Sequence, residues 1–478
     1  MANINVESMS SVYVSEKKDP DSDELLTINT LTLGNNEIKR KISDEESESE
    51  LDEHEEESES ESDEDESGGY IDKNYGDFNY GDIIANRYVL IKKIGYGTFS
   101  TVWLAYLLDV NSQHKKFFAI KVHHQEYYSY GMSESSFLMK LRSFDIPCVT
   151  LYETLNFIPL NSTSNKASVC FVFDLMTCSV DALFKMRQYE DGLPEDVVVS
   201  FTKQIVETLI QIKNRGYFYT DVRPENMLVQ TKNDQMDEFC RRFNELEYDK
   251  RWRDTCEQIL KDKGFNLKKK KHKEAFNNIK RKLSIELVKQ TVKPIEEAVE
   301  NISRNIRVDT NTKVYLSDFG NVLKSEKYND DFNIQSRNYK APEVLLCIPY
   351  TFTVDVWSLG CCIYEMLTGN YCIDPKETKY YTIESNQLFW MIELLGQFPK
   401  YMAQNANTEE KHFFKSGKFR CDDMEKDWSI SKAIDAEGVD ISDKMLDILQ
   451  STLVLDFKKR ITFEELLEKL EKIKINIK

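Results

Sequence analysis

The sequence has no Cys-x-x-Cys pair and no long apolar run. Its ten cysteines are scattered, and Cys361-Cys362 is the only close pair, which argues against a zinc ribbon or a disulfide framework and is typical of a reducing compartment. No stretch approaches the roughly 20 apolar residues needed to cross a bilayer, and residues 1–5 lack the basic and apolar regions of a signal peptide. We therefore expect a soluble, intracellular protein without a membrane partner, cytoplasmic and with nuclear entry left open.

One region lacks positive charge altogether. Between Asp44 and Glu66 there are sixteen Asp or Glu residues and no Lys or Arg. Removing these from the net charge of −19 leaves about −3, so the remainder of the chain is nearly neutral. A low-complexity, self-repelling tract of this kind predicts a disordered acidic N-terminal arm over residues 1–79. The arm is either a solvating tail or a regulatory, partner-binding segment, and Ser47 and Ser58, each followed by an acidic residue, suit an acid-directed kinase.

The most informative stretch runs from Tyr219 to Asn226. Asp221 stands five positions before Asn226, and Arg223 lies between them. A carboxylate can accept a hydroxyl proton, an amide oxygen can ligate a hard metal ion, and a cation can neutralise a phosphate. Those are the requirements of phosphoryl transfer. By itself this stretch could equally be an ordinary polar turn, so its weight depends on partners elsewhere.

A glycine-rich hairpin is one such partner. Strand-like runs at 88–94 and 101–106 flank a turn at 95–100 that contains Gly95 and Gly97. Two glycines allow backbone N–H groups to approach a phosphate, although a plain hairpin would use them as well.

A lysine inside an apolar strand is a second partner. Lys121 lies in the run 118–122, where its ammonium requires a paired charge. Glu134 is the best candidate for that charge, and Glu126 is also within reach in the sequence.

Further elements complete the pattern. We predict a strand at 168–173, an amphipathic helix at 194–215, and a strand at 313–316 that leads into Asp318-Phe319-Gly320. A carboxylate at such a strand end suits a magnesium ion that bridges phosphates.

Taken together, these motifs resemble those of eukaryotic-type protein kinases. The resemblance implies an α+β, two-lobed fold, with a small antiparallel β lobe, a larger helical lobe and ATP between them. It implies that Asp221, Arg223, Lys121 and Glu134 are catalytic, and that Asn226 and Asp318 bind Mg²⁺. The implied nucleotide site comprises the hinge residues Asp174 and Met176, Lys121, and the roof residues Ile94, Gly95, Tyr96, Gly97, Thr98, Phe99, Ser100, Thr101 and Val102.

Within the kinases, the sequence is most similar to the SR-protein kinases, as a divergent member of viral or other source. The run from Gly95 to Leu104, Thr220 before the catalytic Asp, and a long spacer all fit that family. The resemblance implies a serine/threonine kinase whose protein substrates are rich in Arg and Ser. Ser336 falls where such kinases place a hydroxyl that bonds the catalytic Asp, and Asp355 falls where they brace the catalytic loop. Arg460 matches the arginine that pairs with Glu343.

Three departures bear on this reading. Arg223 replaces the usual lysine, and a planar guanidinium is not equivalent to an ammonium. Tyr219 replaces histidine. The acidic docking cluster of the family is thinned to residues 383–386.

The expected organisation has five parts. After the acidic arm come the small lobe at 80–176, the first part of the large lobe at 177–230, an insert at 231–308, and the second part of the large lobe at 309–478. We expect the insert to be largely helical and partly mobile. Its Lys268–Lys273 run is either a solvated loop, which we favour, or a nuclear-localisation or nucleic-acid patch.

We expect a monomer that acts on protein substrates and does not bind nucleic acid directly. The alternative is a pseudokinase scaffold without turnover, for which the changes at Tyr219 and Arg223 argue. Retention of Lys121, Asp221 and Asp318 argues against it. A small-molecule phosphotransferase with the same fold is disfavoured by the peptide-platform motif at 336–343.

Overall fold

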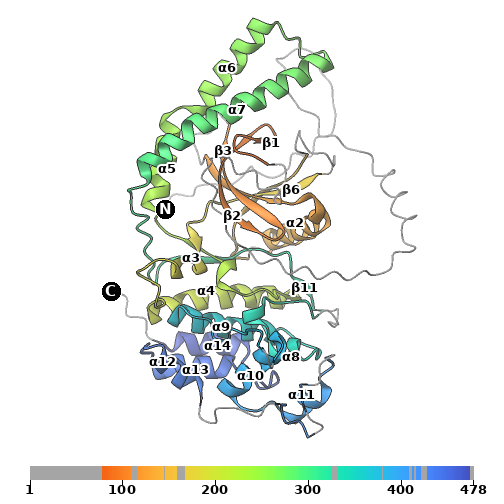
Figure 1. Cartoon of the computed structure of the whole chain (residues 1–478), viewed down its shortest axis with the longest axis vertical. Coiled ribbons are helices and arrows are strands. Elements are labelled where there is room, and N and C mark those ends of the chain that lie inside the picture. The colour runs from red at the N-terminus through yellow and green to blue at the C-terminus, as the bar shows by residue number, and fades with distance from the viewer. Residues whose placement is uncertain are drawn as a thin grey trace, which may run out of the picture. The chain divides into compact units, whose positions relative to one another are not determined.

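The smaller lobe is built on a six-stranded antiparallel sheet (Figure 1). The computed structural model describes residues 78–108, 116–144, 146–158, 167–325, 332–378, 381–408, 412–413, 416–420 and 428–473. The predicted acidic arm lies outside these residues. Across the sheet the strand order is β1 (Ile83–Ile84), β2 (Tyr88–Gly97), β3 (Ser100–Leu107), β4 (Phe117–His123), β6 (Ser168–Phe173) and β5 (Leu151–Phe157).

The predicted glycine-rich hairpin is present as β2 and β3. Gly97 pairs with Ser100 and Gly95 with Val102, so that only Thr98 and Phe99 remain in the turn. The strands therefore extend further than the sequence pattern indicated. This extension carries the hairpin out over the cleft described below.

Helix α2 (Tyr128–Ser143) follows the short 3-10 helix η1 (Gln125–Tyr127) and packs on one face of the sheet. Its apolar residues Phe137 and Leu138 are buried with Val169 and Phe171 of β6. This packing fixes the height at which Glu134, also buried, faces the sheet.

Three helices between β9 and β10 pack against β2, β3 and β4 (Figure 1), on the same face of the sheet as α2. They are α5 (Asp234–Glu245), α6 (Tyr248–Lys263) and α7 (Lys270–Val299). Their side chains share one buried apolar cluster with β2, β3 and β4, which we call the insert cluster. It contains Val89, Ile91, Leu104, Tyr106, Phe117, Phe239, Phe243, Tyr248, Trp252, Cys256, Phe276, Val288, Val292, Ile295 and Val299.

Charged pairs at the rim of the insert cluster fix its register. Arg281 Nε lies 2.6 Å from Asp82 Oδ1, and Lys92 Nζ lies 2.5 Å from Glu296 Oε1. At Gly81 an added Cβ would lie 2.4 Å from Cα of Ile285, and φ is +84°, so the chain needs glycine to pass this close to α7. The helical character predicted for the insert is confirmed, and its close packing on the small lobe was not predicted.

The expectation of a solvated loop at the lysine run is wrong in part. Lys270 to Lys273 form the first turn of α7, although their side chains are exposed or only half-buried. Further along α7, Lys280 Nζ lies 5.0 Å from the centroid of the Trp252 ring, a cation–π contact inside the insert.

The larger lobe is mainly helical. Its two small sheets have the orders β10-β9-β7 and β11-β8, from the strands β7 (Cys178–Ser179), β8 (Tyr217–Phe218), β9 (Met227–Gln230), β10 (Lys313–Leu316) and β11 (Leu323–Lys324). The early helices are α3 (Val180–Phe184), α4 (Glu195–Asn214) and η2 (Pro224–Asn226). The predicted 194–215 helix is therefore confirmed to within one residue at each end.

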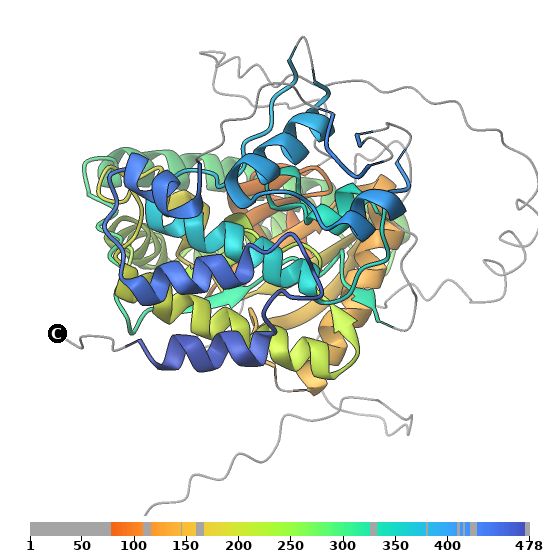
Figure 2. The ribbon, with the colours of Figure 1, turned by 90° about the horizontal axis from the view of Figure 1, so that it is seen from below.

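The later helices pack around α9 (Thr353–Thr368), which is one of them and is buried along its whole length. They are η3 (Arg337–Tyr339), α8 (Pro342–Leu345), α9 (Thr353–Thr368), α10 (Ile383–Leu395), α11 (Lys400–Asn405), α12 (Ile430–Ala436), α13 (Asp443–Thr452) and α14 (Phe463–Glu471). All 16 residues of α9 are buried, as expected of a helix enclosed by others. Figure 2 shows the blue α14 beside the olive α4, and α4 contacts both α14 and α9. No helix among the described residues is long and apolar enough to cross a membrane.

The insert cluster yields a stability prediction. Phe243 is fully buried, with ring centroids of Tyr106 and Tyr248 at 5.1 and 5.3 Å. We expect Phe243→Ala to destabilise the protein by about 3–5 kcal/mol, because it removes a buried ring and leaves a cavity. Thermal unfolding should show a clear fall in Tm. Leu246→Ala, at the exposed end of the same helix, is the matched control and should change Tm little. Equal Tm values for the two variants would contradict the packing described.

Candidate active site

A cleft of about 1300 Å³ opens between the hairpin and the larger lobe. Most of the predicted site residues line it: Ile94, Gly95, Tyr96, Gly97, Ser100, Val102, Lys121, Glu134, Asp174, Met176, Arg223, Asn226 and Asp318. Residues of α5 and α7 extend its wall beyond the hinge, among them Met236, Glu297 and Glu300. A pocket of this size exceeds what one drug-sized ligand needs.

Three residues of the predicted roof do not line the cleft. Thr98 is exposed at the tip of the turn. Phe99 instead packs on Tyr127 and Tyr130, with ring centroids 4.8 and 5.1 Å away. Thr101 is turned to the opposite face, where its hydroxyl accepts a hydrogen bond from Trp103 Nε1 at 3.0 Å. Because side chains alternate across a strand, Ser100 and Val102 reach the cleft and Thr101 cannot.

An ionic cluster joins the two lobes at the back of the cleft. Lys121 Nζ on β4 lies 2.9 and 3.0 Å from the two carboxylate oxygens of Glu134 on α2. It also lies 3.0 Å from Asp318 Oδ1 of the larger lobe. The lysine is thus paired with Glu134, whereas Glu126 lies in η1 with an exposed side chain.

The electrostatics keep this cluster charged. Burial alone would lower the pKa of Lys121, but Glu134 and Asp318 outweigh it and raise that pKa above its usual value. Burial acts to raise the pKa of Asp318, yet the neighbouring Lys121 ammonium holds it below its ordinary value. At neutral pH the Lys121 ammonium therefore faces the ionised carboxylate of Asp318 in the cleft.

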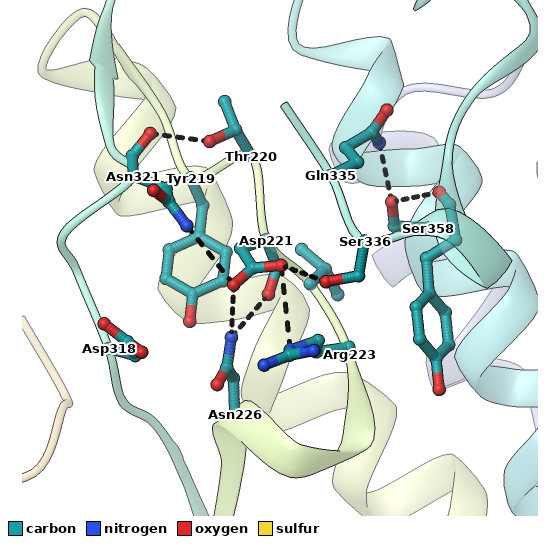
Figure 3. Close-up of polar contacts among 12 residues, drawn as sticks. Tyr219, Thr220, Asp221, Arg223, Asn226, Asp318, Asn321, Gln335, Ser336 and Ser358 are labelled. Atoms are coloured by element: carbon teal, nitrogen blue, oxygen red, sulfur yellow. Dashed lines mark hydrogen bonds and ion pairs between the residues drawn. The ribbon is translucent and has the colours of Figure 1, made fainter. Parts of the chain in front are cut away.

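The catalytic-loop residues converge on Asp221 (Figure 3). Ser336 Oγ donates to Asp221 Oδ1 at 3.1 Å, as predicted, and Arg223 Nε lies 3.7 Å from the same oxygen. Asn226 donates its amide hydrogens to the side chain and the backbone carbonyl of Asp221, at 2.9 and 3.0 Å. The side-chain oxygen Oδ1 of Asn226, which lines the cleft, is the atom that could bind a cation, whereas its backbone carbonyl oxygen accepts from Ser317.

Asp355, at the start of α9, holds the loop in place as predicted. Its two carboxylate oxygens accept the backbone N–H groups of Tyr219 and Thr220, at 2.9 and 2.7 Å. The Tyr219 hydroxyl donates to the carbonyl of Ser317, just before Asp318. Tyrosine at this position therefore ties the catalytic loop to the strand that carries Asp318.

Thr220 adopts a left-handed conformation, with φ of +66°, a conformation that few non-glycine residues take. Its hydroxyl donates to the Asn321 carbonyl at 2.6 Å. The side chain of Thr220 is thus occupied in holding the segment after Asp318 against the loop.

A buried ion pair supports the platform beneath. Both Arg460 and Glu343 have side chains that are 0% exposed, and their two N···O contacts are 2.6 and 2.9 Å. Arg460 also donates to the carbonyl of Thr353, at the start of α9. The predicted pairing is therefore present, and it fixes α8 against α9.

Sequence reasoning missed three residues at this site. His123 Nε2 lies 2.9 Å from Glu134 Oε2. Tyr130 donates to Asn321 Oδ1 at 3.1 Å, and the amide of Asn321 lies 3.5 Å from Asp221 Oδ2. His123 stands two positions after Lys121 on one strand, so the period of two could have placed both on one face. No local pattern pointed to Tyr130.

Fold and site together define a phosphotransferase of the protein-kinase architecture. The model of the protein kinase domain family matches residues 88–239 and 303–470, which is more than half of the chain. The chain belongs to the protein kinase family, and it is a serine/threonine kinase that uses ATP and acts on proteins.

Individual relatives agree with this assignment. The chain is 25% identical over 410 residues to "Serine/threonine-protein kinase SRPK" of Physarum polycephalum, covering 84% of this chain and 89% of the relative. It is 23% identical over 455 residues to "Protein kinase dsk1" of Schizosaccharomyces pombe, covering 81% and 82%. The crystal structure of a kinase domain aligns with a TM-score of 0.57 at 19% identity, covering 83% of this chain and 98% of that one. That structural likeness bears on the fold alone.

The anchor at Asp355 yields a kinetic prediction. In Asp355→Ala two buried N–H groups lose their acceptor, each at a cost of roughly 1–3 kcal/mol, so the catalytic loop loosens. We expect kcat to fall by about 10- to 100-fold, while the KM for ATP changes by less than about threefold because Lys121 and the hinge are untouched. Steady-state kinetics measures both constants. Asp435→Ala, an exposed change on α12, should leave both unchanged, and a wild-type kcat in Asp355→Ala would refute the role of the anchor.

Proposed function

We propose that the cleft transfers the γ-phosphoryl group of ATP to Ser or Thr hydroxyls of Arg/Ser-rich proteins, as a divergent SR-protein-kinase-like enzyme. The observation that carries the proposal is that the Lys121–Glu134–Asp318 cluster and Asn226 line one cleft, and that Asn226 bonds Asp221 at 2.9 Å. Active sites of this type rely on positioning and charge stabilisation.

In this proposal each residue has a defined task. Asp221 orients the acceptor hydroxyl and accepts its proton, and Ser336 holds one of its carboxylate oxygens. Lys121 steadies the α- and β-phosphates and Glu134 positions Lys121. Arg223 stabilises the charge that develops on the transferring group.

The carboxylate oxygens of Asp318 and the side-chain amide oxygen of Asn226 fit Mg²⁺, a hard cation that takes carboxylate and amide oxygens. When bound with ATP, Mg²⁺ would supply charge neutralisation at the phosphates. Ile94, Gly95, Tyr96, Gly97, Ser100 and Val102 would form the roof over the nucleotide, and Asp174 and Met176 the hinge.

Glu225 is the carboxylate of the cleft that supports a basic substrate. Glu225 and Asp181 both line the cleft, and Asp181 is paired with Lys185 at 2.8 Å, whereas Glu225 Oε2 is buried without a hydrogen-bond partner among the described residues. Burial is the main reason that the pKa of Glu225 is raised, and Asp181 contributes further. A cationic side chain of a substrate would relieve both effects.

The first turn of α10, where the family has its acidic docking cluster, provides few carboxylates for a basic substrate. Its Ser385 bonds His412, and Asn386 accepts from the backbone of Lys376. Glu384 is the only charged residue of positions 383–386. Recognition of Arg-rich segments would therefore rest mainly on Glu225 and Asp181 of the cleft lining.

The domain division is also a proposal. It places the small lobe at 80–176, the parts of the large lobe at 177–230 and 309–478, and the insert at 231–308. The family model omits residues 240–302, and α5 to α7 span most of the proposed insert, which supports these boundaries.

The direct test is transfer of labelled phosphate from Mg-ATP by the purified full chain. The panel comprises an Arg-Ser repeat peptide, an acidic-site peptide and a generic basic protein, with Asp221→Asn and chelation of Mg²⁺ as controls. We expect preferential labelling of the Arg-Ser peptide that both controls abolish. Labelling of the other substrates alone would overturn the substrate assignment. ATP binding without any transfer would favour a scaffold.

Thr220 leads to a second prediction. The arginine usual at this position binds a phosphorylated activation loop, whereas Thr220 instead bonds the Asn321 carbonyl. We expect phosphatase-treated protein to retain at least half of its activity toward the same peptide. Complete loss of activity after treatment would contradict this reading.

A further inference from the structure

His123 is the feature of the active site that the family motifs do not account for. It follows Lys121 by two positions on β4, so both side chains project from the same face of the sheet toward α2. Both reach the same carboxylate. Glu134 Oε2 lies 2.9 Å from Lys121 Nζ and 2.9 Å from His123 Nε2.

The surroundings of the His123 ring favour a fixed hydrogen bond. The ring is 0% exposed and packs edge-on against Phe171, with centroids 5.2 Å apart. Its Nδ1 has no hydrogen-bond partner among the described residues. A buried N–H without an acceptor is costly, so the ring proton belongs on Nε2, where it is donated to Glu134.

The helix comes unusually close to this ring. A Cβ added to Gly131 of α2 would lie 3.0 Å from His123 Cδ2 and 3.0 Å from Val169 Cβ. Gly131 is the fourth residue of α2, and its lack of a Cβ gives the helix the room to sit directly on His123.

The other bonds of Glu134 show why a second donor matters. Glu134 Oε1 accepts from Lys121 at 3.0 Å and from the backbone N–H of Phe319 at 3.3 Å. Lys121 is shared with Asp318. Among the described residues, His123 makes no hydrogen bond to a second carboxylate, so its bond to Oε2 holds Glu134 even when Lys121 moves toward Asp318.

We propose that His123 is a positioning residue, which holds Glu134 and through it keeps Lys121 oriented toward the phosphates of ATP. This inference deepens the proposed function, because it depends on the role given there to Lys121. His123 thus adds a third residue to the interaction between Lys121 and Glu134, and it lies on the same strand as Lys121.

The test compares three variants of the full chain. His123→Leu keeps a buried side chain of similar size without a donor. His123→Gln restores an amide donor at the position of Nε2. Ser135→Ala is the matched control, because Ser135 neighbours Glu134 on α2 and its hydroxyl donates to Thr154 of β5, at 3.1 Å. It therefore loosens α2 without touching the carboxylate.

We expect His123→Leu to lower kcat/KM for ATP about tenfold and to raise the KM for ATP at least threefold, with the KM for the peptide unchanged. His123→Gln should recover most of this loss, and Ser135→Ala should keep the wild-type KM for ATP. Partial unfolding would instead reduce kcat alone.

Two results would overturn the inference: a wild-type KM for ATP in His123→Leu, or the same increase in His123→Leu, His123→Gln and Ser135→Ala. Calorimetric titration of each variant with Mg-ATP separates this inference from the proposed function, because it measures binding even if the wild-type protein transfers no phosphate. An affinity of His123→Leu equal to that of the wild type would again contradict the role of His123.

Discussion

The rest of the site depends on the ion pairs that the Lys121 ammonium makes with Glu134 and Asp318. Lys121 stands on the small lobe, bonds Glu134 on α2 and reaches Asp318 on the large lobe, all within 3.0 Å. A buried charge is tolerated only when it is paired. The bonds of Lys121 therefore couple the positions of α2, the sheet and Asp318. Moving any one of these elements would break the contact of Lys121 with Glu134 or with Asp318.

Contacts outside that cluster hold the same arrangement. Phe99 at the hairpin tip packs on Tyr130 of α2, which bonds Asn321 beyond Asp318. On the same face of the sheet as α2, the insert cluster packs against β2, β3 and β4. Thr220 and Asp355 hold the catalytic loop through backbone groups.

Local patterns in the sequence were sufficient to predict much of this. The hairpin, the 194–215 helix and the Lys121, Asp221 and Asp318 motifs each depend on residues a few positions apart. The packing of the insert depends on pairs such as Asp82 with Arg281 and Lys92 with Glu296, which lie 199 and 204 positions apart. No periodicity links such pairs. Thr101 was assigned to the roof because every residue of the motif was assumed to face the nucleotide, although alternate side chains of a strand point to opposite faces. The same alternation places His123 on the face of Lys121.

The most direct test of this account is a crystal structure of the full chain with Mg²⁺ and a non-hydrolysable ATP analogue. The account predicts a metal ion held by Asp318 and the amide oxygen of Asn226, Lys121 at the α- and β-phosphates, and Glu134 still bonded to Lys121. A nucleotide bound without metal, or a Lys121 that stays with Asp318 and does not touch the phosphates, would contradict it.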